Sequence, residues 1–123
     1  MRLTVLVLSF VLLAGCATAP QSPASFADAQ RLFDAQPRTD ATDAYGTAWA
    51  GFNNAHHLDE RDGCYFKADG PLVQILQIDG SGKIIGYFAD QENGRSKCWR
   101  QTYLGVTFPK PPFAPFFHRL EMQ

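Results

Sequence analysis

The sequence predicts an α+β fold, in which a small antiparallel sheet carries helices packed on one face, in the order αββαβ. Apolar residues follow helical spacing in the first half of the chain, and short apolar runs alternate with glycine and proline turns in the second half. The helices are expected to cover one side of the sheet because nothing else in so short a chain can bury it. A single domain is predicted over residues 25–123.

Two helical patterns precede the predicted sheet. Ser25, followed by Asp28, is typical of a helix start, and Pro37 ends this short helix. Asp40 is the next expected cap, and the second pattern continues to about residue 56. Its apolar face is formed by Tyr45, Ala48, Trp49, Phe52 and Ala55.

A β-hairpin is predicted after a charged loop at residues 58–63. Residues 64–68 and 72–78 are rich in β-branched, aromatic and apolar residues, which favours strands interrupted by a bulge or turn. The tetrapeptide Asp79-Gly80-Ser81-Gly82 predicts a tight turn, and residues 83–89 are the expected return strand.

The last third of the chain predicts a helix and a final strand. Residues 95–104 have a helical pattern that carries Cys98, with Gly105 as the stop signal. The prolines of residues 108–112 require extended backbone, and residues 116–122 hold enough apolar side chains for a short strand.

The N-terminus has the composition of an export signal. Arg2 supplies a positive start, and residues 3–13 form an apolar run too short to span a membrane. The motif Leu13-Ala14-Gly15-Cys16 that follows resembles the bacterial lipobox. This resemblance implies that residues 1–15 are a signal peptide and that Cys16 is acylated; a plain secretory signal with a chance cysteine is the alternative.

The lipobox resemblance also implies a compartment. A lipid-anchored chain lies outside the cytoplasm, where disulfides persist. With Cys16 used by the anchor, Cys64 and Cys98 form an even pair and predict one disulfide, worth about 3–4 kcal/mol for a loop of about 35 residues. Ala17, rather than aspartate, follows Cys16, and by the rule for enteric-type bacteria this implies attachment to the outer membrane, facing the periplasm. Residues 16–24 predict a flexible tether.

Charge and composition limit the partners. The formal net charge is −1, and it becomes −2 when Arg2 leaves with the signal, so a nucleic-acid partner has no electrostatic support. The membrane, through the lipid anchor, and another envelope protein are the expected partners, and no cofactor is expected.

The C-terminal part of the chain resembles the C-terminal domains of the envelope proteins TolA and TonB, over about residues 41–122. The resemblance rests on the order of Cys64, the hairpin segment from Leu76 to Ile84, Cys98 and Phe108-Pro109-Lys110-Pro111-Pro112. It implies a similar fold and a disulfide between equivalent elements. A short lipid-anchored tether replaces the inner-membrane helix and long periplasmic region of those proteins, so energy transduction is not implied.

Metal and catalytic sites have little support in the sequence. Adjacent His56 and His57 on a helix point about 100° apart, so the acidic residues after them predict a solvated loop. Lys83 occupies a position where a calcium loop needs an oxygen ligand. Ser81 lies in a hairpin rather than on a strand-to-helix turn. No catalytic residue and no metal ligand are therefore predicted.

Two binding hypotheses remain for a non-enzymatic envelope lipoprotein. The first is strand addition of a partner at the final strand, a candidate sheet edge formed by Phe116, Phe117, His118, Arg119 and Leu120. The second is binding of an anionic cell-wall or lipid ligand by Arg95, Lys97 and Arg100, near a helix N-terminus.

Overall fold

The structure is a computed structural model that describes residues 22–123. Within these residues the elements are α1 (Phe26–Ala35), α2 (Asp40–Ala55), the 3-10 helix η1 (Arg61–Lys67), β1 (Leu72–Ile78), β2 (Ile84–Ala89), α3 (Gly94–Tyr103) and β3 (Phe116–Met122). The α+β class is confirmed. The order αββαβ is wrong, because two α-helices and a 3-10 helix precede the hairpin. The predicted signal peptide and Cys16 lie outside the described residues.

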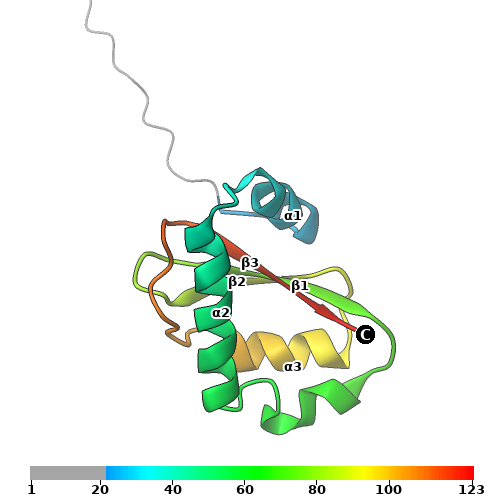
Figure 1. The fold of residues 1–123 in the computed structure, drawn as a ribbon. Helices are drawn as coiled ribbons and strands as arrows, with labels where there is room; N and C mark the ends of the chain where they lie inside the picture. The colour runs from blue at the N-terminus through cyan, green and yellow to red at the C-terminus, as the bar shows by residue number, and fades with distance from the viewer. Residues whose placement is uncertain (1–21) are drawn as a thin grey trace, which may run out of the picture.

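The three strands form one antiparallel sheet in the order β2-β1-β3 (Figure 1). β1 is the central strand, and Ile75 pairs with Phe88 on one side and with Arg119 on the other. The predicted hairpin is confirmed: the Asp79 carboxylate accepts hydrogen bonds from the backbone of Ser81 and Lys83, at 2.9 and 3.0 Å. Because β1 lies between the other two strands, β3 is an edge strand, as the proline segment before it predicted.

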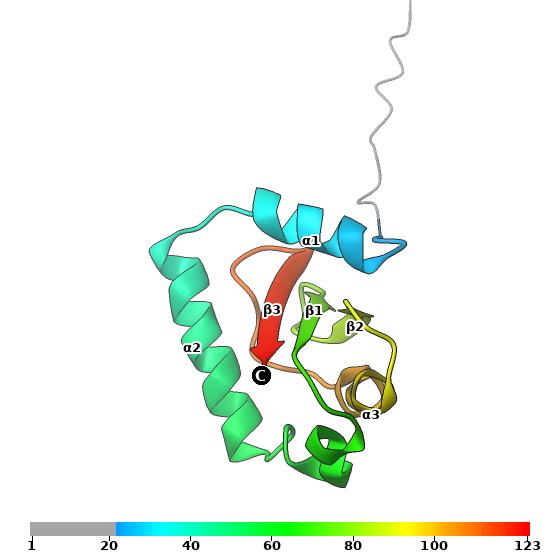
Figure 2. The same cartoon turned by 90° about the vertical axis from the view of Figure 1, so that its right-hand side faces the viewer.

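Helices cover both faces of the sheet, so the prediction of one covered face is wrong. Leu76 of β1 belongs to a large core with Trp49 of α2 and Trp99 of α3, whereas Ile75 packs on the opposite face against Ala29 of α1. Figures 1 and 2 place α1 on one side of the sheet and α3 on the other. A central strand covered on both faces loses the alternation of apolar and polar residues, and every residue of β1 except Val73 is buried.

Each α-helix begins at a polar cap. The Ser25 hydroxyl accepts a hydrogen bond from the Asp28 amide at the start of α1, as predicted. The cap of α2 is Thr39, one residue before the expected Asp40, because Thr39 and Thr42 bond each other's backbone reciprocally. The Thr39 cap fixes where α2 begins after the turn that follows α1.

The predicted strand at residues 64–68 is also wrong, because this segment lies in η1. Asp62 has φ +57° and Gly63 φ +60°, which turns the chain back before a strand can form. Cys64 is bonded to Cys98 of α3, with the two Cα atoms 5.3 Å apart, so the predicted disulfide is confirmed. The bond holds η1 against α3 rather than against the sheet.

Candidate functional site

The two outer strands of the sheet differ in how far the chain covers them. At the start of β2, the Ile84 amide donates to the Val106 carbonyl and the Gly105 amide donates to the Ile84 carbonyl, both at 2.9 Å. Lys83 and Thr107 form a further β-bridge there. The segment between α3 and β3 thus closes part of the β2 edge, and β3 is left as the more open edge.

The hydrogen bonds of Phe117 show which way the backbone N–H and C=O groups of β3 point. Its N–H donates to Oε1 of Gln36 at 2.7 Å, and its C=O accepts from Nε2 of Gln36 at 3.0 Å. Both groups are therefore directed away from β1. In an antiparallel ladder this direction repeats at every second residue, so the N–H and C=O of Arg119 and Glu121 also point outward. Within residues 22–123, the outward groups of Arg119 and Glu121 form no hydrogen bond.

A groove of about 570 Å³ runs between this edge and α2. Its strand side is formed by residues 116–119, and its helix side includes Gly46 and Ala50, one turn apart. A Cβ added at Gly46 would meet no atom within 4 Å, so the small side chains leave open space. Figure 2 shows α2 alongside β3, with the whole length of both elements in view. The groove therefore leaves open space next to the unpaired backbone groups of Arg119.

Aromatic contacts fix the distance between α2 and β3. The rings of Trp49 and His118 are 4.4 Å apart, and those of Tyr45 and Phe116 are 4.8 Å apart. The Tyr45 hydroxyl donates to the Pro109 carbonyl at 2.9 Å, and burial raises the pKa of Tyr45 to about 12. Burial lowers the pKa of His118 to about 4, so its imidazole is neutral at pH 7.

The predicted strand residues are brought together in β3, but few of their side chains are available. Phe116 and Phe117 are 3% and 4% exposed, and Leu120 packs against the main core. The Arg119 side chain donates to Gln30 of α1 at 3.1 Å and pairs with Glu121. The part of β3 that is available for contact with another molecule is therefore its outward backbone.

Sequence reasoning missed the role of α2 as the second wall of the groove. The small residues Gly46 and Ala50 on one helix face were the available signal. Gln36 was missed as well, because nothing local connects it to Phe117, 81 positions away.

The basic residues Arg95, Lys97 and Arg100 do not form a cluster. Arg95 is only 4% exposed; it donates to the Tyr65 carbonyl at 2.7 Å and to the Gly70 carbonyl. Lys97 is exposed. Arg95 is therefore buried and holds η1 and the following turn in place, whereas Lys97 faces solvent.

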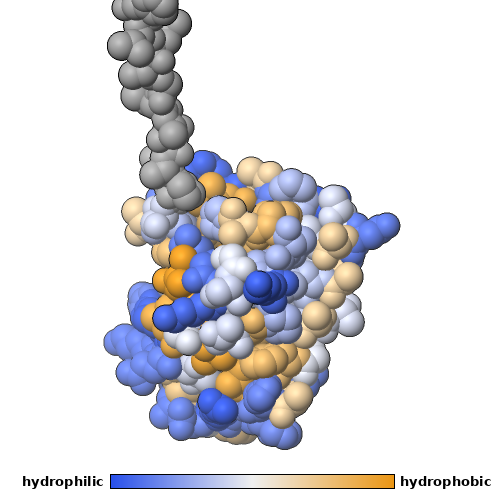
Figure 3. Space-filling model, turned by 90° about the vertical axis from the view of Figure 1, so that its left-hand side faces the viewer, coloured by the Kyte–Doolittle hydropathy of each residue, from blue (hydrophilic) through white to orange (hydrophobic). Residues whose placement is uncertain are grey.

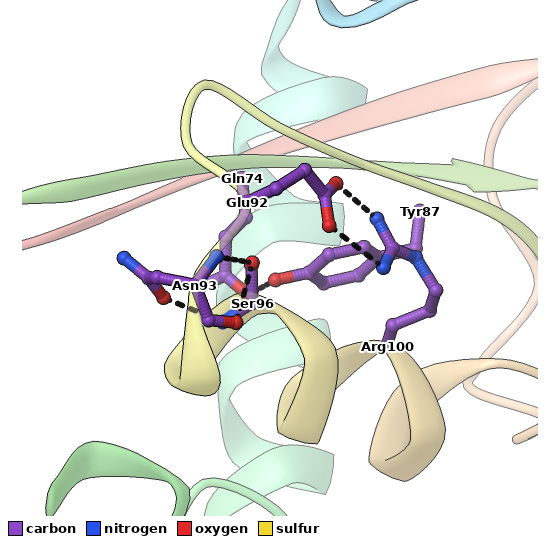
Figure 4. A network of polar contacts seen from close by, with 6 residues as sticks. All are labelled: Gln74, Tyr87, Glu92, Asn93, Ser96 and Arg100. Carbon is purple, nitrogen blue, oxygen red and sulfur yellow. Dashed lines mark hydrogen bonds and ion pairs between the residues drawn. The ribbon is translucent and has the colours of Figure 1, made fainter. Parts of the chain in front are cut away.

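Arg100 is engaged in a separate polar network (Figure 4). It forms two hydrogen bonds with the Glu92 carboxylate and lies over the Tyr87 ring, 5.2 Å from its centroid. The Arg100 contact lowers the pKa of Glu92. Behind it, the Tyr87 hydroxyl donates to the side-chain carbonyl of buried Gln74. Two of the three predicted anion ligands are thus already paired within the chain.

The face shown in Figure 3 carries apolar side chains in small groups separated by polar ones. Among residues 22–123, no three His, Cys, Asp or Glu residues lie close enough to hold a metal ion. None of the described helices has both the length and the apolar character that a membrane crossing requires.

No protein-family model, curated protein or solved structure matches this chain, so the similarity to the TolA and TonB C-terminal domains stays a prediction.

Proposed function

We propose that this chain is a non-enzymatic cell-envelope lipoprotein, anchored at Cys16, whose domain binds an extended segment of another envelope protein as a fourth strand on β3. The observation that carries the proposal is the unpaired outward backbone of Arg119, which borders the groove along α2, and of Glu121, two residues further along the same edge. Backbone hydrogen bonds along an open edge give affinity to a peptide of almost any sequence, and neighbouring cavities select its side chains.

The groove geometry supports an added strand in a further way. Neighbouring strands lie about 4.8 Å apart, so a new strand needs space beside β3 but no displacement of β1 or β2. That space exists between residues 116–119 and α2. Each new backbone bond contributes about 0.5–1.5 kcal/mol, so two outward residues give modest affinity unless side chains add to it.

The anion-binding hypothesis is less well supported. Arg95 is buried and bonded to backbone carbonyls, and Arg100 is paired with Glu92. Only Lys97 of the three is exposed without such a partner among the described residues. Binding of a polyanion would have to break an existing ion pair.

A matched pair of variants tests strand addition. Arg119→Pro removes one outward N–H without removing a hydrogen bond of the β1–β3 ladder, and an edge strand tolerates proline at such a position. Arg119→Ala removes the same side-chain contacts and keeps the N–H. A linear peptide selected from a displayed random library against the domain is the probe.

Strand addition requires that the probe protect the amides of Arg119 and Glu121 from hydrogen exchange. Arg119→Pro should then lose binding, while Arg119→Ala keeps it. Protection confined to α3, with binding lost in Lys97→Glu and Arg100→Glu, would overturn the proposal in favour of the anion site. A selection that yields no binder would also count against it.

A further inference from the structure

A second cavity, of about 560 Å³, lies at the C-terminal end of β3. Its apolar wall is formed by Tyr65 and Phe66 of η1, Trp99 of α3 and Met122 of β3. The groove along α2 reaches the same strand at residues 116–119. One strand therefore borders two hollows in succession, with the outward backbone of Arg119 and Glu121 between them.

Two aromatic side chains on η1 are unusually exposed. Phe66 is 87% exposed and Tyr65 48%, and their ring centroids are 5.4 Å apart in an edge-on arrangement. Neither ring is needed to fill the core. Exposed aromatic groups of this kind, placed beside a cavity, are typical of surfaces that bind a partner.

The indole of Trp99 provides a hydrogen-bond donor without a partner. Trp99 is 1% exposed, and its Nε1 is bonded to no atom of residues 22–123. Buried donors are nearly always paired, and an unpaired one costs about 1–3 kcal/mol. The nitrogen is itself buried, so a ligand in the cavity would contact the ring of Trp99 rather than its N–H.

The rim of the cavity is acidic. Asp59, Glu60 and Glu121 line it, and no lysine or arginine does. Glu121 is paired with Arg119, which lies outside the cavity. The Tyr65 ring already stacks with the Arg95 guanidinium, 4.4 Å from its centroid, so the aromatic face open to a ligand is that of Phe66. Carboxylates beside this ring favour a cation with an apolar stem, both by charge attraction and through cation–π contact.

We infer that this cavity selects the sequence of the peptide that β3 accepts, by taking an aromatic side chain next to a lysine or arginine. The inference rests on the proposed strand addition. The aromatic ring packs against Phe66 and Trp99, and the cation lies at the acidic rim. A strand advances about 3.3 Å per residue, so a segment paired with Arg119 and Glu121 reaches the cavity with its next residues.

Four synthetic peptides test the inference. Each has the same fluorescein-labelled stem of alternating threonine and valine, and they end in Trp-Lys, Trp-Glu, Ala-Lys or Ala-Glu. A second set carries the same pairs at the other end of the stem, since a strand can add in either direction. Binding is measured by fluorescence anisotropy, and strand addition is measured separately by hydrogen exchange of the Arg119 and Glu121 amides.

The Trp-Lys peptide should bind about tenfold more tightly than Ala-Glu in one of the two sets, which corresponds to about 1.4 kcal/mol. Phe66→Ala and Glu60→Lys should remove most of that difference. Leu104→Ala and Asp69→Lys are the controls, because they change an exposed apolar and an exposed acidic residue away from the cavity.

The two proposals fail in different ways. Equal affinity of all peptides together with protected β3 amides would overturn the cavity inference and leave strand addition standing. A preference for Trp-Lys that depends on Phe66 and Glu60, without amide protection, would support the cavity and refute strand addition. Absence of binding by every peptide would refute both.

Discussion

The side-chain amide of Gln36 occupies the place of a neighbouring strand, because it accepts from the N–H of Phe117 and donates to its C=O. A glutamine amide carries the same donor and acceptor as a peptide group. The chain thus satisfies the first outward position of β3 by itself. An added strand would begin its pairing at Arg119, so Gln36 sets the register of binding.

Removing this cap should expose the Phe117 backbone. Gln36→Ala should lower the free energy of unfolding by about 1 kcal/mol and speed exchange of the Phe117 amide. The exchange rate is measured by NMR, and Gln101→Ala, an exposed glutamine on α3, is the control. Unchanged Phe117 exchange in Gln36→Ala would show that the amide is protected by something else.

The neutral imidazole of His118 should make stability depend on pH. Its pKa is about 4 in the folded chain and near 6.5 when unfolded, so the unfolded chain takes up the proton first as pH falls. Stability should be complete above pH 6.5, fall by up to about 3 kcal/mol towards pH 4, and level off for this group below that. Chemical unfolding at successive pH values measures the slope.

The variant His118→Phe isolates that contribution. It keeps an aromatic ring against Trp49 and removes the titrating group, so the slope between pH 7 and 5 should flatten. An equal slope in His118→Phe and the parent chain would show that other groups cause it.

Loss of the disulfide should lower the free energy of unfolding by about 2–4 kcal/mol. Cys64→Ala, Cys98→Ala and the double variant should have similar effects, because each removes the same bond between η1 and α3. Urea unfolding measures the difference. Mass spectrometry that finds two free thiols in the native protein would contradict the bond.

The buried pair of Tyr87 and Gln74 should show the cost of an unpaired polar group. Tyr87→Phe removes the hydroxyl that donates to the Gln74 side chain and should destabilise the domain by about 1–3 kcal/mol. Adding Gln74→Leu removes the orphaned amide, so the double variant should recover part of the loss. A double variant less stable than Tyr87→Phe would rule out this explanation.

The lipid anchor is tested in cells. Cys16→Ser removes the thiol that the lipobox resemblance implies is acylated, so the protein should leave the membrane fraction or be mislocalised. Outer-membrane attachment predicts that the parent chain separates with outer-membrane markers. Unchanged membrane fractionation of Cys16→Ser would exclude the anchor.

The sequence predicted most of the helices and strands correctly because turn residues, caps and residue spacing act within each element. The hairpin follows from Asp79 and the glycines beside it. Gly82 has φ +95°, and a Cβ there would lie 2.0 Å from the Phe108 carbonyl oxygen, so only glycine fits. The disulfide followed from counting cysteines rather than from any knowledge of their positions.

The errors have long-range causes. Residues 64–68 have strand composition, but Arg95, 30 positions beyond Tyr65, bonds its carbonyl and helps to hold the turn of η1. The second face of the sheet is covered because α1 packs on it. The spacing of apolar residues within α1 does not specify which face the helix will cover. The groove likewise depends on α2 and β3, which are distant in sequence, lying side by side.

The position of the Cys64–Cys98 bond has a consequence for the proposed binding surface, because the bond ties η1 to α3. Cys64 is the only buried residue of η1, so the exposed Tyr65 and Phe66 are held less by burial than by a covalent cross-link to α3. A chain still in a reducing compartment would lack that cross-link and present a loosely held aromatic wall. Under the proposed function, oxidation after export would complete the cavity, so a partner would meet the finished surface only in an oxidising compartment.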